Sequence, residues 1–270
     1  MGHKTLIGGT SYDIKSGRTL IGGTGYDIKK GRTLIDGTGY DIGFSTSVGE
    51  LAVGSSVYMN VDGVRTEYII VHQGNPDPTI YDASCNGTWL LMKDIYEIRE
   101  WHTTSLENNL ENSTVHSYLN DTFLNLFDAN IRDAIKQVKI PYRKGGGNGG
   151  TDQSGANGLS CKAFLLSGYE LGWTTSDSNY FPVDGAKLDY FMSGSTTAAN
   201  SKRIANYKGS ANYWWLRSPN TNGSSKVWYV ISSGGYGNNS YVSGQLGIRS
   251  TFIFPQNDVF IDDNFNIITP

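Results

Sequence analysis

Few residues of this chain have the types and spacing that catalysis or metal binding needs. The histidines have no second histidine three or four positions away, and no group of His, Cys and carboxylate residues has a metal-ligand spacing; the histidines are His3, His72, His102 and His116. Cys85 or Cys161 could pair with a histidine as an activated nucleophile, but a chain of this length contains such residues by chance. The two cysteines form either a buried pair of free thiols or one disulfide. We therefore expect no enzymatic activity, no metal and no cofactor.

Two further patterns are weak candidates for chemistry. The glycine-rich run at residues 145–150 follows Ile140-Pro141 and is not followed by Lys-Ser or Lys-Thr, so it does not match a phosphate-binding loop. Asp262-Asp263 is more typical of a polar turn than of an acid/base pair. No cluster of carboxylates near the loops requires calcium.

The segment from Asn220 to Tyr241 is dominated by Asn, Ser, Gly, Tyr and Trp. Tyr and Trp supply large contact areas with only two χ angles to fix, and Ser, Gly and Asn adapt their hydrogen bonds, which is the composition of an antibody-like binding surface. An ordinary polar loop region is the alternative. The residues that we expect to contact a ligand are Asn220, Asn222, Ser224, Ser225, Lys226, Trp228, Tyr229, Ser232, Ser233, Tyr236, Asn238, Asn239, Ser240 and Tyr241.

Four of these residues have specific predicted roles. Trp228 and Tyr236 are the aromatic anchors, while Asn238 and Asn239 supply directional hydrogen bonds. Because the flanking Gly and Ser residues favour loops, we expect the side chains of this segment to face solvent.

Two apolar stretches on either side of this segment must position it. Residues 211–219 contain Trp214, Trp215 and Arg217, and residues 247–255 contain Gly247 and Arg249. The tryptophans can form a buried plug, and an arginine fork can bind loop carbonyls or a carboxylate. We expect both stretches to be buried frame strands.

The rest of the globular region predicts an α+β fold of short strands, a few helices and long loops. Residues 57–71 read as two strands around the Asp62-Gly63 turn, and residues 88–92 as a buried strand. Helices are expected within residues 112–120, where Asn112 or Ser113 is the cap, and within 122–128 and 130–138. A further strand at 162–166 and a short helix at 184–191 complete this prediction.

The first 45 residues contain three copies of a 14-residue repeat, at positions 4–17, 18–31 and 32–42. Each copy has two short β-prone runs separated by glycines, which predicts one hairpin of a meander. Such thin hairpins cannot bury a core alone, so we expect them to pack on the rest of the chain, on sister subunits or on a larger assembly; a flexible tail is the alternative. The expected domains are residues 1–46 and 47–270, with a variable region at about 212–249.

Composition excludes several classes of partner. The chain has 22 basic and 25 acidic residues and a net charge of −3, which does not fit nucleic-acid binding. No stretch approaches the ~20 apolar residues of a membrane span, and no secretory signal is visible. If the protein leaves the cell, export by lysis as part of a virion is the expected route.

Residues 213–219 read Tyr-Trp-Trp-Leu-Arg-Ser-Pro and are followed by Gly247-Ile-Arg249. They resemble the "WWLRSP … GVRP" signature of an uncharacterised domain family of phages of Gram-positive and gut bacteria and of those bacteria's surface proteins. Residues 117–123 resemble its "WLN…F" helix, 164–167 its "FLLS" strand and 184–191 its "DGxKLxYF" element. The resemblance covers about residues 49–255, with Ser250 in place of the usual proline. The N-terminal copies resemble repeats at the start of such phage proteins.

The resemblance implies a C-type-lectin-like fold of the formylglycine-generating-enzyme subtype, as used by the variable proteins of diversity-generating retroelements. Error-prone reverse transcription in those systems scatters Asn codons into Tyr, Ser, Asp and Gly, which fits the composition of residues 220–241. Neither Cys85 nor Cys161 matches the active-site motif of the formylglycine-generating enzymes.

These observations together predict a hypervariable receptor-binding protein on a phage tail or capsid surface. Its partner would be a protein or glycan of the host-cell surface, and its repeats would contact sister subunits or other virion proteins. A bacterial surface adhesin of the same fold is the first alternative, and an enzyme of the formylglycine-generating type is the second.

Overall fold

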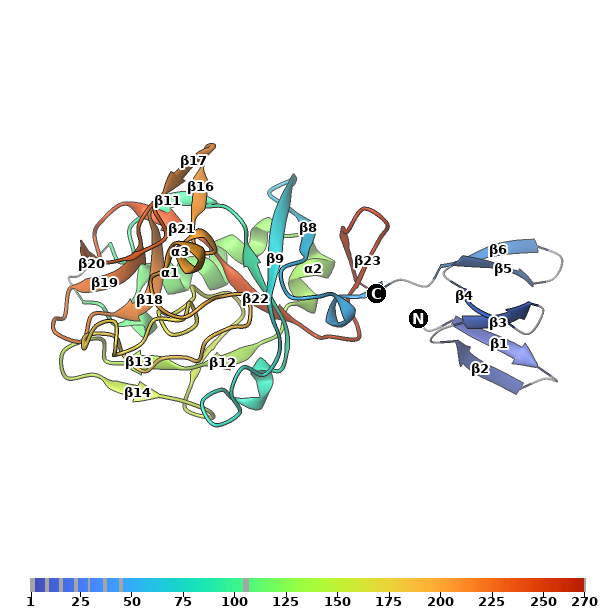
Figure 1. Cartoon of the computed structure of the whole chain (residues 1–270), viewed down its shortest axis with the longest axis horizontal. Coiled ribbons are helices and arrows are strands. Elements are labelled where there is room, and N and C mark those ends of the chain that lie inside the picture. Colours follow the sequence, from blue (N-terminus) through green and yellow to red (C-terminus); the bar gives the residue numbers. More distant parts are fainter. Residues whose placement is uncertain are drawn as a thin grey trace. The chain divides into compact units, whose positions relative to one another are not determined.

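A computed structural model describes residues 46–103 and 107–269 with their side chains, apart from the side chain of Asn239, and the backbone of six strands between residues 3 and 43. The chain divides into two compact units, of which one ends at Thr46 and the other spans Ser47–Thr269 (Figure 1). The second unit carries the candidate site.

The expected α+β, C-type-lectin-like fold is wrong. The structure is largely β, with 35% strand and 15% helix, and its three described α-helices are only five or six residues long. The physical reason is the length of the apolar runs, because runs of three to six residues between turns suit small antiparallel sheets better than helices.

Each N-terminal repeat forms one antiparallel hairpin. The strands are β1 (His3–Ile7), β2 (Thr10–Ile14), β3 (Gly17–Ile21), β4 (Thr24–Ile28), β5 (Lys30–Ile35) and β6 (Thr38–Gly43). The register pairs Thr5 with Tyr12 and, one repeat later, Thr19 with Tyr26. The described strands form three separate two-stranded sheets rather than a continuous meander. The glycines between the two strands of each hairpin lie outside the described residues. The predicted packing of the repeats on other surfaces stays a prediction.

A four-stranded antiparallel sheet forms one part of the globular unit. Its order is β22 (Thr251–Phe254), β10 (Gly87–Met92), β9 (Val64–Gly74) and β8 (Ser56–Val61). Asp62 and Gly63 both have positive φ, 52° and 73°, as a tight two-residue hairpin turn requires. The predicted hairpin at residues 57–71 and the buried strand at 88–92 are confirmed.

A five-stranded sheet positions the segment of interest. Its order is β11 (Glu97–Arg99), β21 (Leu246–Ile248), β18 (Trp214–Pro219), β19 (Lys226–Val230) and β20 (Tyr236–Tyr241). β18 pairs with β21 in parallel, and the other neighbours are antiparallel. In Figure 1 β19 and β20 lie at one end of the globular unit.

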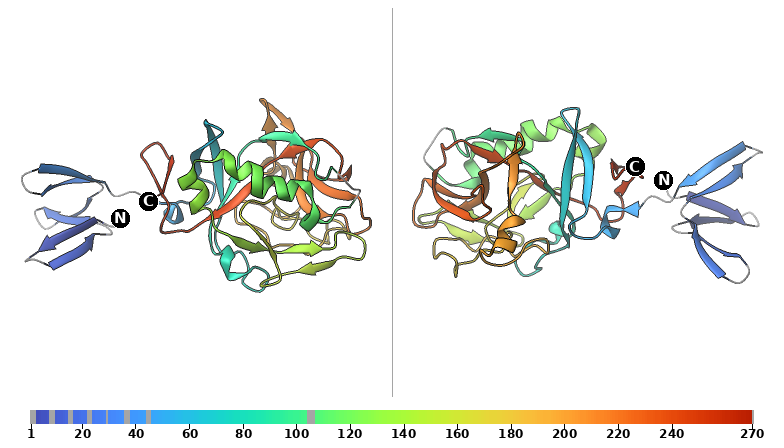
Figure 2. Two further views of the ribbon diagram at one scale, coloured as in Figure 1. Left: turned by 180° about the vertical axis from the view of Figure 1, so that it is seen from behind. Right: turned by 45° about the horizontal axis from the view of Figure 1, so that its top comes forward.

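A run of short helices crosses the back of the unit, shown in green in Figure 2. The helical elements are η1 (Val48–Glu50), η2 (Ala83–Cys85), η3 (Leu110–Asn112), α1 (Thr114–Tyr118), η4 (Leu119–Phe123), η5 (Leu124–Leu126), α2 (Ala129–Ala134) and α3 (Thr197–Ser201). Ser113 caps α1 by accepting a hydrogen bond from the backbone N–H of His116. In the described part of the chain, no helix has the length and apolar character needed to cross a membrane.

Two predicted elements are absent from the described residues. Residues 184–191 form no helix, because Asp184 accepts a hydrogen bond from Ser218 and the N–H of Ala186 donates to Tyr81. Residues 162–166 form no strand of their own and contribute only the bridge between Phe164 and Thr251.

Smaller sheets of two or three strands complete the unit. They are β7 (Thr46–Ser47) with β23 (Phe260–Ile261) and β24 (Ile267–Ile268), β12 (Val138–Ile140) with β15 (Leu159–Cys161), β13 (Tyr142–Lys144) with β14 (Thr151–Gln153), and β16 (Ala205–Tyr207) with β17 (Ser210–Asn212).

The apolar side chains form two core clusters. Because side chains alternate along a strand, Trp215 belongs to the first cluster while its neighbour Trp214 belongs to the second. In the same way Val227 enters the first cluster and Trp228 the second. The five-stranded sheet therefore has core packing on both faces.

Candidate binding surface

Trp228 is a core residue. Its side chain has no exposed area, its ring stacks on Phe181 with a centroid separation of 3.8 Å, and its Nε1 donates to the carbonyl of Tyr180 at 3.1 Å. The expectation that Trp228 faces solvent as a binding anchor is wrong. The reason is the alternation of β19, which directs Trp228 into the second core cluster.

Two other expected contact residues also hold the structure together. Asn220 is only 7% exposed, and its backbone N–H donates to Lys226 while its Oδ1 accepts from the N–H of Asn222. Tyr236 is half-buried between Trp173 and Trp228 and donates its hydroxyl to the carbonyl of Asp177 at 3.0 Å. The expectation of solvent exposure is wrong for Asn220 and holds only in part for Tyr236.

The remaining expected contact residues reach the surface to different degrees. The exposed ones are Asn222, Ser224, Ser233 and Tyr241, and the half-buried ones are Ser225, Lys226, Tyr229, Ser232, Asn238 and Ser240. The side chain of Asn239 lies outside the described residues. Lys226 pairs with Tyr241 across the strands, whereas Tyr229 lies on the opposite face of β19. The structure therefore does not bring all of the expected residues onto one face.

The expected frame residues are all buried: Trp214, Trp215, Arg217, Gly247 and Arg249. A side chain at Gly247 would come within 2.7 Å of Ile95, so close packing explains the glycine.

Arg217 is the centre of a buried polar network. Its guanidinium forms a bidentate ion pair with Glu170, at 2.5 and 2.8 Å. The other hydrogen bonds go to the carbonyls of Pro141, Leu165 and Asp184, so all five N–H donors are used. Burial disfavours the charge of Arg217, but the carboxylate of Glu170 outweighs it and raises the pKa.

The network extends to the side chains of Tyr81, Ser218 and Asp184. Tyr81 donates its hydroxyl to Glu170 at 2.8 Å, and Ser218 donates to Asp184 at 2.7 Å. Burial raises the pKa of Asp184 to about 7, although Arg217 and Ser218 oppose that shift. Since every member is almost completely buried, the network joins distant loops and does not present chemistry to a ligand.

Two tyrosines lie side by side and partly exposed on the face of the sheet that carries Trp215. The ring centroids of Tyr213 and Tyr229 are 6.0 Å apart, and Tyr213 is 42% exposed. The ring of Tyr229 also meets the buried ring of Trp215 edge-on at 6.2 Å. A Cβ at Gly237 would overlap the ring of Tyr229, so this glycine makes room for it. The tyrosines are thus held on a rigid support while part of their surface remains free.

Ser240 and Leu246 flank this pair. Ser240 lies opposite Val227, which shares a face with Tyr229, and half-buried Leu246 packs against the same core cluster as Tyr229. We call Tyr213, Tyr229, Ser240 and Leu246 the tyrosine surface. Tyr213 and Leu246 were not among the expected contact residues, although the alternation Tyr213-Trp214-Trp215 indicates that Tyr213 shares a face with Trp215.

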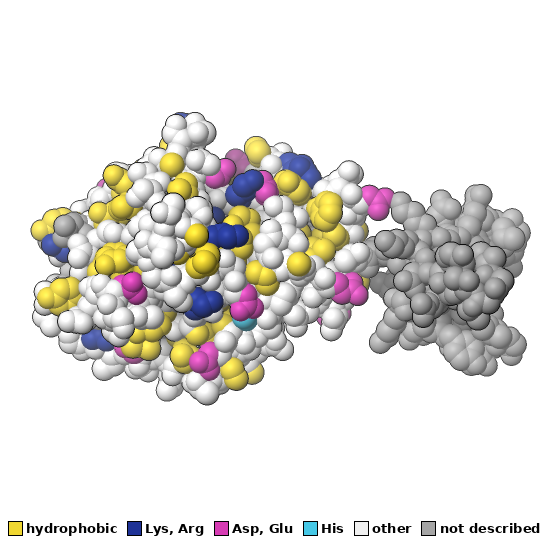
Figure 3. All heavy atoms as spheres, viewed as in Figure 1, with side chains coloured by type: hydrophobic (Ala, Val, Ile, Leu, Met, Phe, Trp, Pro, Cys, Tyr) yellow, Lys and Arg dark blue, Asp and Glu magenta, His cyan; other side chains and the backbone are white. Residues whose placement is uncertain are grey.

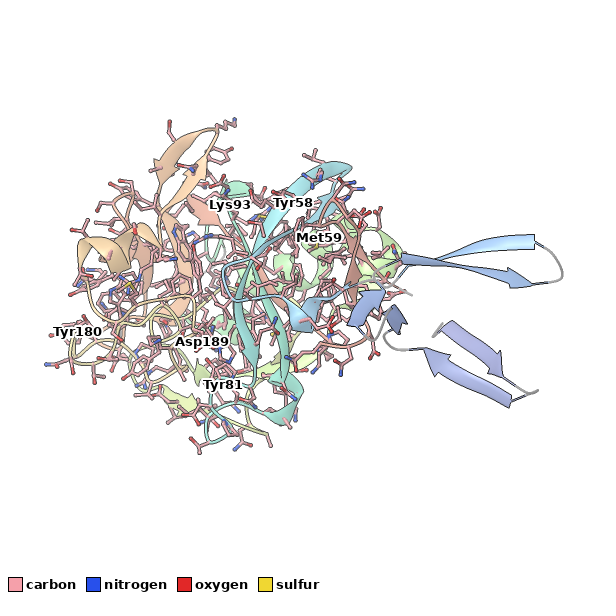
Figure 4. All side chains as sticks on the ribbon, turned by 45° about the vertical axis from the view of Figure 1, so that its right-hand side comes forward. Tyr58, Met59, Tyr81, Lys93, Tyr180 and Asp189 are labelled. Carbon is pink, nitrogen blue, oxygen red and sulfur yellow. The ribbon has the colours of Figure 1, made fainter. Side chains whose placement is uncertain are left out.

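Two grooves lie elsewhere, along the β8–β9 hairpin. The larger has a volume of about 550 Å³, and its lining includes Lys93 and Glu67, whose charged groups pair at 2.8 Å. The smaller, of about 410 Å³, is lined in part by Tyr58 and Met59. Figure 4 shows Tyr58, Met59 and Lys93 at this hairpin, far from Tyr180. None of the expected contact residues lines either groove.

The described residues offer little for catalysis. They contain no group of three His, Cys, Asp or Glu side chains that could hold a metal. Cys85 and Cys161 are free and buried, and burial raises the pKa of Cys85 to about 12 and that of Cys161 further above its ordinary value. Burial also lowers the pKa of His72 and His116. A nucleophilic cysteine needs the opposite change.

Charge does not dominate the surface seen in Figure 3, where Lys, Arg, Asp and Glu side chains are scattered among uncharged ones. The fold thus defines a mostly antiparallel β domain with a buried arginine-centred frame and, on one face of its five-stranded sheet, a pair of partly exposed tyrosines.

Residues 86–256 match the family described as Domain of unknown function (DUF6273), and the chain belongs to this family. No curated protein and no solved structure matches the chain. The folded unit is longer than the matched region, because Val57 in β8 and Ile261 in β23 belong to the first core cluster. An uncharacterised family was expected from the signature, and this part of the prediction is confirmed.

Proposed function

We propose that residues 47–269 form a ligand-binding domain whose main contacts come from the tyrosine surface. The observation that carries this proposal is the support of Tyr213 and Tyr229 by buried Trp215, with 42% of Tyr213 left exposed. Tyrosines fixed in this way supply contact area at a low cost in conformational entropy. Such aromatic residues often dominate the binding energy of an interface.

The partner that fits this surface is a protein or glycan of a host-cell surface, bound by a phage tail or capsid protein. The N-terminal repeats and the signature that resembles phage proteins support this setting. The four residues of the tyrosine surface are uncharged, which fits recognition by aromatic packing and hydrogen bonds rather than by charge.

We also propose that a retroelement diversifies part of residues 220–241. The Asn, Ser, Tyr and Gly content of residues 220–241 supports it. Because Asn220, Trp228 and Tyr236 pack into the domain, changes there would damage the fold. We therefore expect variation at exposed residues that leave the packing intact, namely Asn222, Ser224 and Ser233.

Cell binding by the full chain tests the proposal. The variant Tyr213→Ser/Tyr229→Ser should lose at least ~30-fold in affinity for a bacterial strain that binds the parent protein, since an aromatic anchor commonly contributes ~2 kcal/mol. Tyr180→Ser is the matched control, because Tyr180 is also 42% exposed and its carbonyl binds Trp228, whose side chain is on the opposite face of β19 from Tyr229. Melting temperatures confirm that both variants fold. Equal binding by the two folded variants would contradict the proposal.

The genes beside this one test the diversification. A reverse transcriptase and a near-identical template repeat should lie next to the gene, with template adenines at the codons that vary. If they are absent, diversification is overturned, while ligand binding is decided separately by the cell-binding measurement. If the protein is instead a bacterial surface adhesin, surface labelling should detect it on bacterial cells that carry the gene and release no phage.

A further inference from the structure

The edges of the two large sheets differ in how they are protected. At the β8 edge, the N–H of Tyr58 donates to the carbonyl of Phe265 at 2.9 Å. At the β22 edge, Thr251 and Phe164 exchange two backbone hydrogen bonds of 2.9 and 2.8 Å. The β11 edge is only three residues long and carries the ion pair of Arg99 with Glu97. Covering, short length and charge are common ways to prevent pairing between sheets.

Among the described residues, β20 is not protected by any of these three features. It is six residues long, its sequence Tyr-Gly-Asn-Asn-Ser-Tyr has no charge and no proline, and in the described part of the chain only β19 pairs with it. An edge of this kind can accept another strand through its free backbone groups.

The sequence of β20 is nearly symmetric about the bond between Asn238 and Asn239. Antiparallel pairing of two copies about that point would place Tyr236 opposite Tyr241 and Gly237 opposite Ser240. Large residues then meet large ones and small residues meet small ones. Direct cross-strand aromatic pairs stabilise antiparallel sheets. Tyr241, which is 53% exposed, would become buried beside Tyr236.

The two ends of β20 have different surroundings. Lys226 holds its ammonium 5.5 Å from the ring centroid of Tyr241, whereas Tyr236 donates its hydroxyl to the backbone carbonyl of Asp177. Antiparallel pairing brings the Lys226 end of one copy to the Tyr236 end of the other. A two-fold interface of this kind uses the same patch on both copies.

We propose that β20 pairs with β20 of a second copy, so that two five-stranded sheets join into one. The association does not require the proposed ligand binding and shares only Ser240 with the tyrosine surface. A dimer would present two tyrosine surfaces and so increase avidity. The pairing is weak, because the strand spans only about 20 Å and Trp228 faces a two-residue bulge at Asn238–Asn239. Small interfaces of this size dissociate readily.

The test measures the full chain over a range of concentrations. Sedimentation equilibrium should show monomers at about 1 μM and dimers at about 100 μM, as expected for a small interface. Amide hydrogen exchange at the two concentrations should slow in β20 and not in β1–β6. Exclusively monomeric protein, or association with unchanged exchange in β20, would overturn the proposal; slowing in β1–β6 alone would assign association to the repeats.

Variants separate the two proposals. Tyr241→Lys removes the aromatic pair and adds a positive charge near Lys226, so it should shift dimerisation at least ~10-fold toward monomer. The control Phe265→Lys changes a 47% exposed aromatic side chain beside the β8 edge and should not shift dimerisation. Tyr213→Ser/Tyr229→Ser should still dimerise even where it no longer binds cells. If Tyr241→Lys does not fold, the concentration-dependent exchange of the parent protein still decides the proposal.

Discussion

The buried network around Arg217 and the tyrosine surface are both built on the five-stranded sheet, yet the environments of their central side chains, Arg217 and Tyr213, are opposite. Arg217 uses all five of its donors inside the protein, whereas Tyr213 keeps 42% of its surface free. A group whose bonding capacity is fully used inside the fold can fix loops but has nothing left for a ligand. A side chain that packs on a buried neighbour but keeps part of its surface exposed can still bind a ligand.

The largest effect should come from breaking the buried ion pair. Arg217→Met leaves the carboxylate of Glu170 buried without its partner and removes hydrogen bonds to three carbonyls. Loss of one member of a buried pair commonly costs about 3–5 kcal/mol, and the free energy of unfolding from urea titration measures it.

The matched control for that variant is Lys93→Met. Lys93 pairs with Glu67 at the same short distance, 2.8 Å, but its side chain is 48% exposed. Exposed pairs typically contribute less than about 1 kcal/mol. Equal losses in the two variants would contradict the view that burial distinguishes the Arg217 network.

The hairpin at residues 57–71, the strand at 88–92 and the cap at Ser113 could be predicted from the sequence, because local turn chemistry and alternation determine them. The network could not, since Glu170 and Arg217 are 47 positions apart and no local pattern links them. The failure at residues 184–191 has the same origin: helical spacing is present, but long-range bonds to Tyr81 and Ser218 fix a different conformation.

The contact area was predicted only in part, for a reason that Trp228 and Tyr229 illustrate. Both fit a binding composition, but one faces the core and the other the surface. Composition does not contain this information. It requires the register of β19, because a shift of one residue exchanges the faces of every side chain in a strand.

The next prediction concerns pH and the network. Burial raises the pKa of Asp184 to about 7 in the folded state, above an unfolded value of about 3.9. Its stabilising contribution is therefore fully present below the unfolded pKa and is lost as the pH rises through 7. For Asp184→Asn, which has no carboxyl to ionise, we expect stability relative to the parent to rise by about 1–3 kcal/mol between pH 5 and pH 8.

Thermal or urea unfolding of both proteins at these two pH values measures that difference. Other carboxyl groups, such as Asp262 with its hydrogen bonds from Asn266, have lowered pKa values and act in the opposite direction. Subtracting the parent from the variant cancels them. An unchanged difference between pH 5 and pH 8 would show that Asp184 does not titrate in this range.

The smallest effect should come from the exposed part of residues 220–241. The combined variant Asn222→Ala/Ser224→Ala/Ser233→Ala/Tyr241→Ala changes only exposed side chains, and each such change usually alters stability by less than about 0.5 kcal/mol. The melting temperature should therefore stay within a few degrees of the parent. Adding Trp228→Ala removes a ring stacked on Phe181 and should cost a further ~3–5 kcal/mol. The difference in stability between the two variants distinguishes exposed side chains that are free for contact from the buried Trp228 that the fold requires. If the four-residue variant melts as early as the one that also lacks Trp228, these loops are part of the packing, and a surface free to vary would have to be sought at Tyr213 and Tyr229 alone.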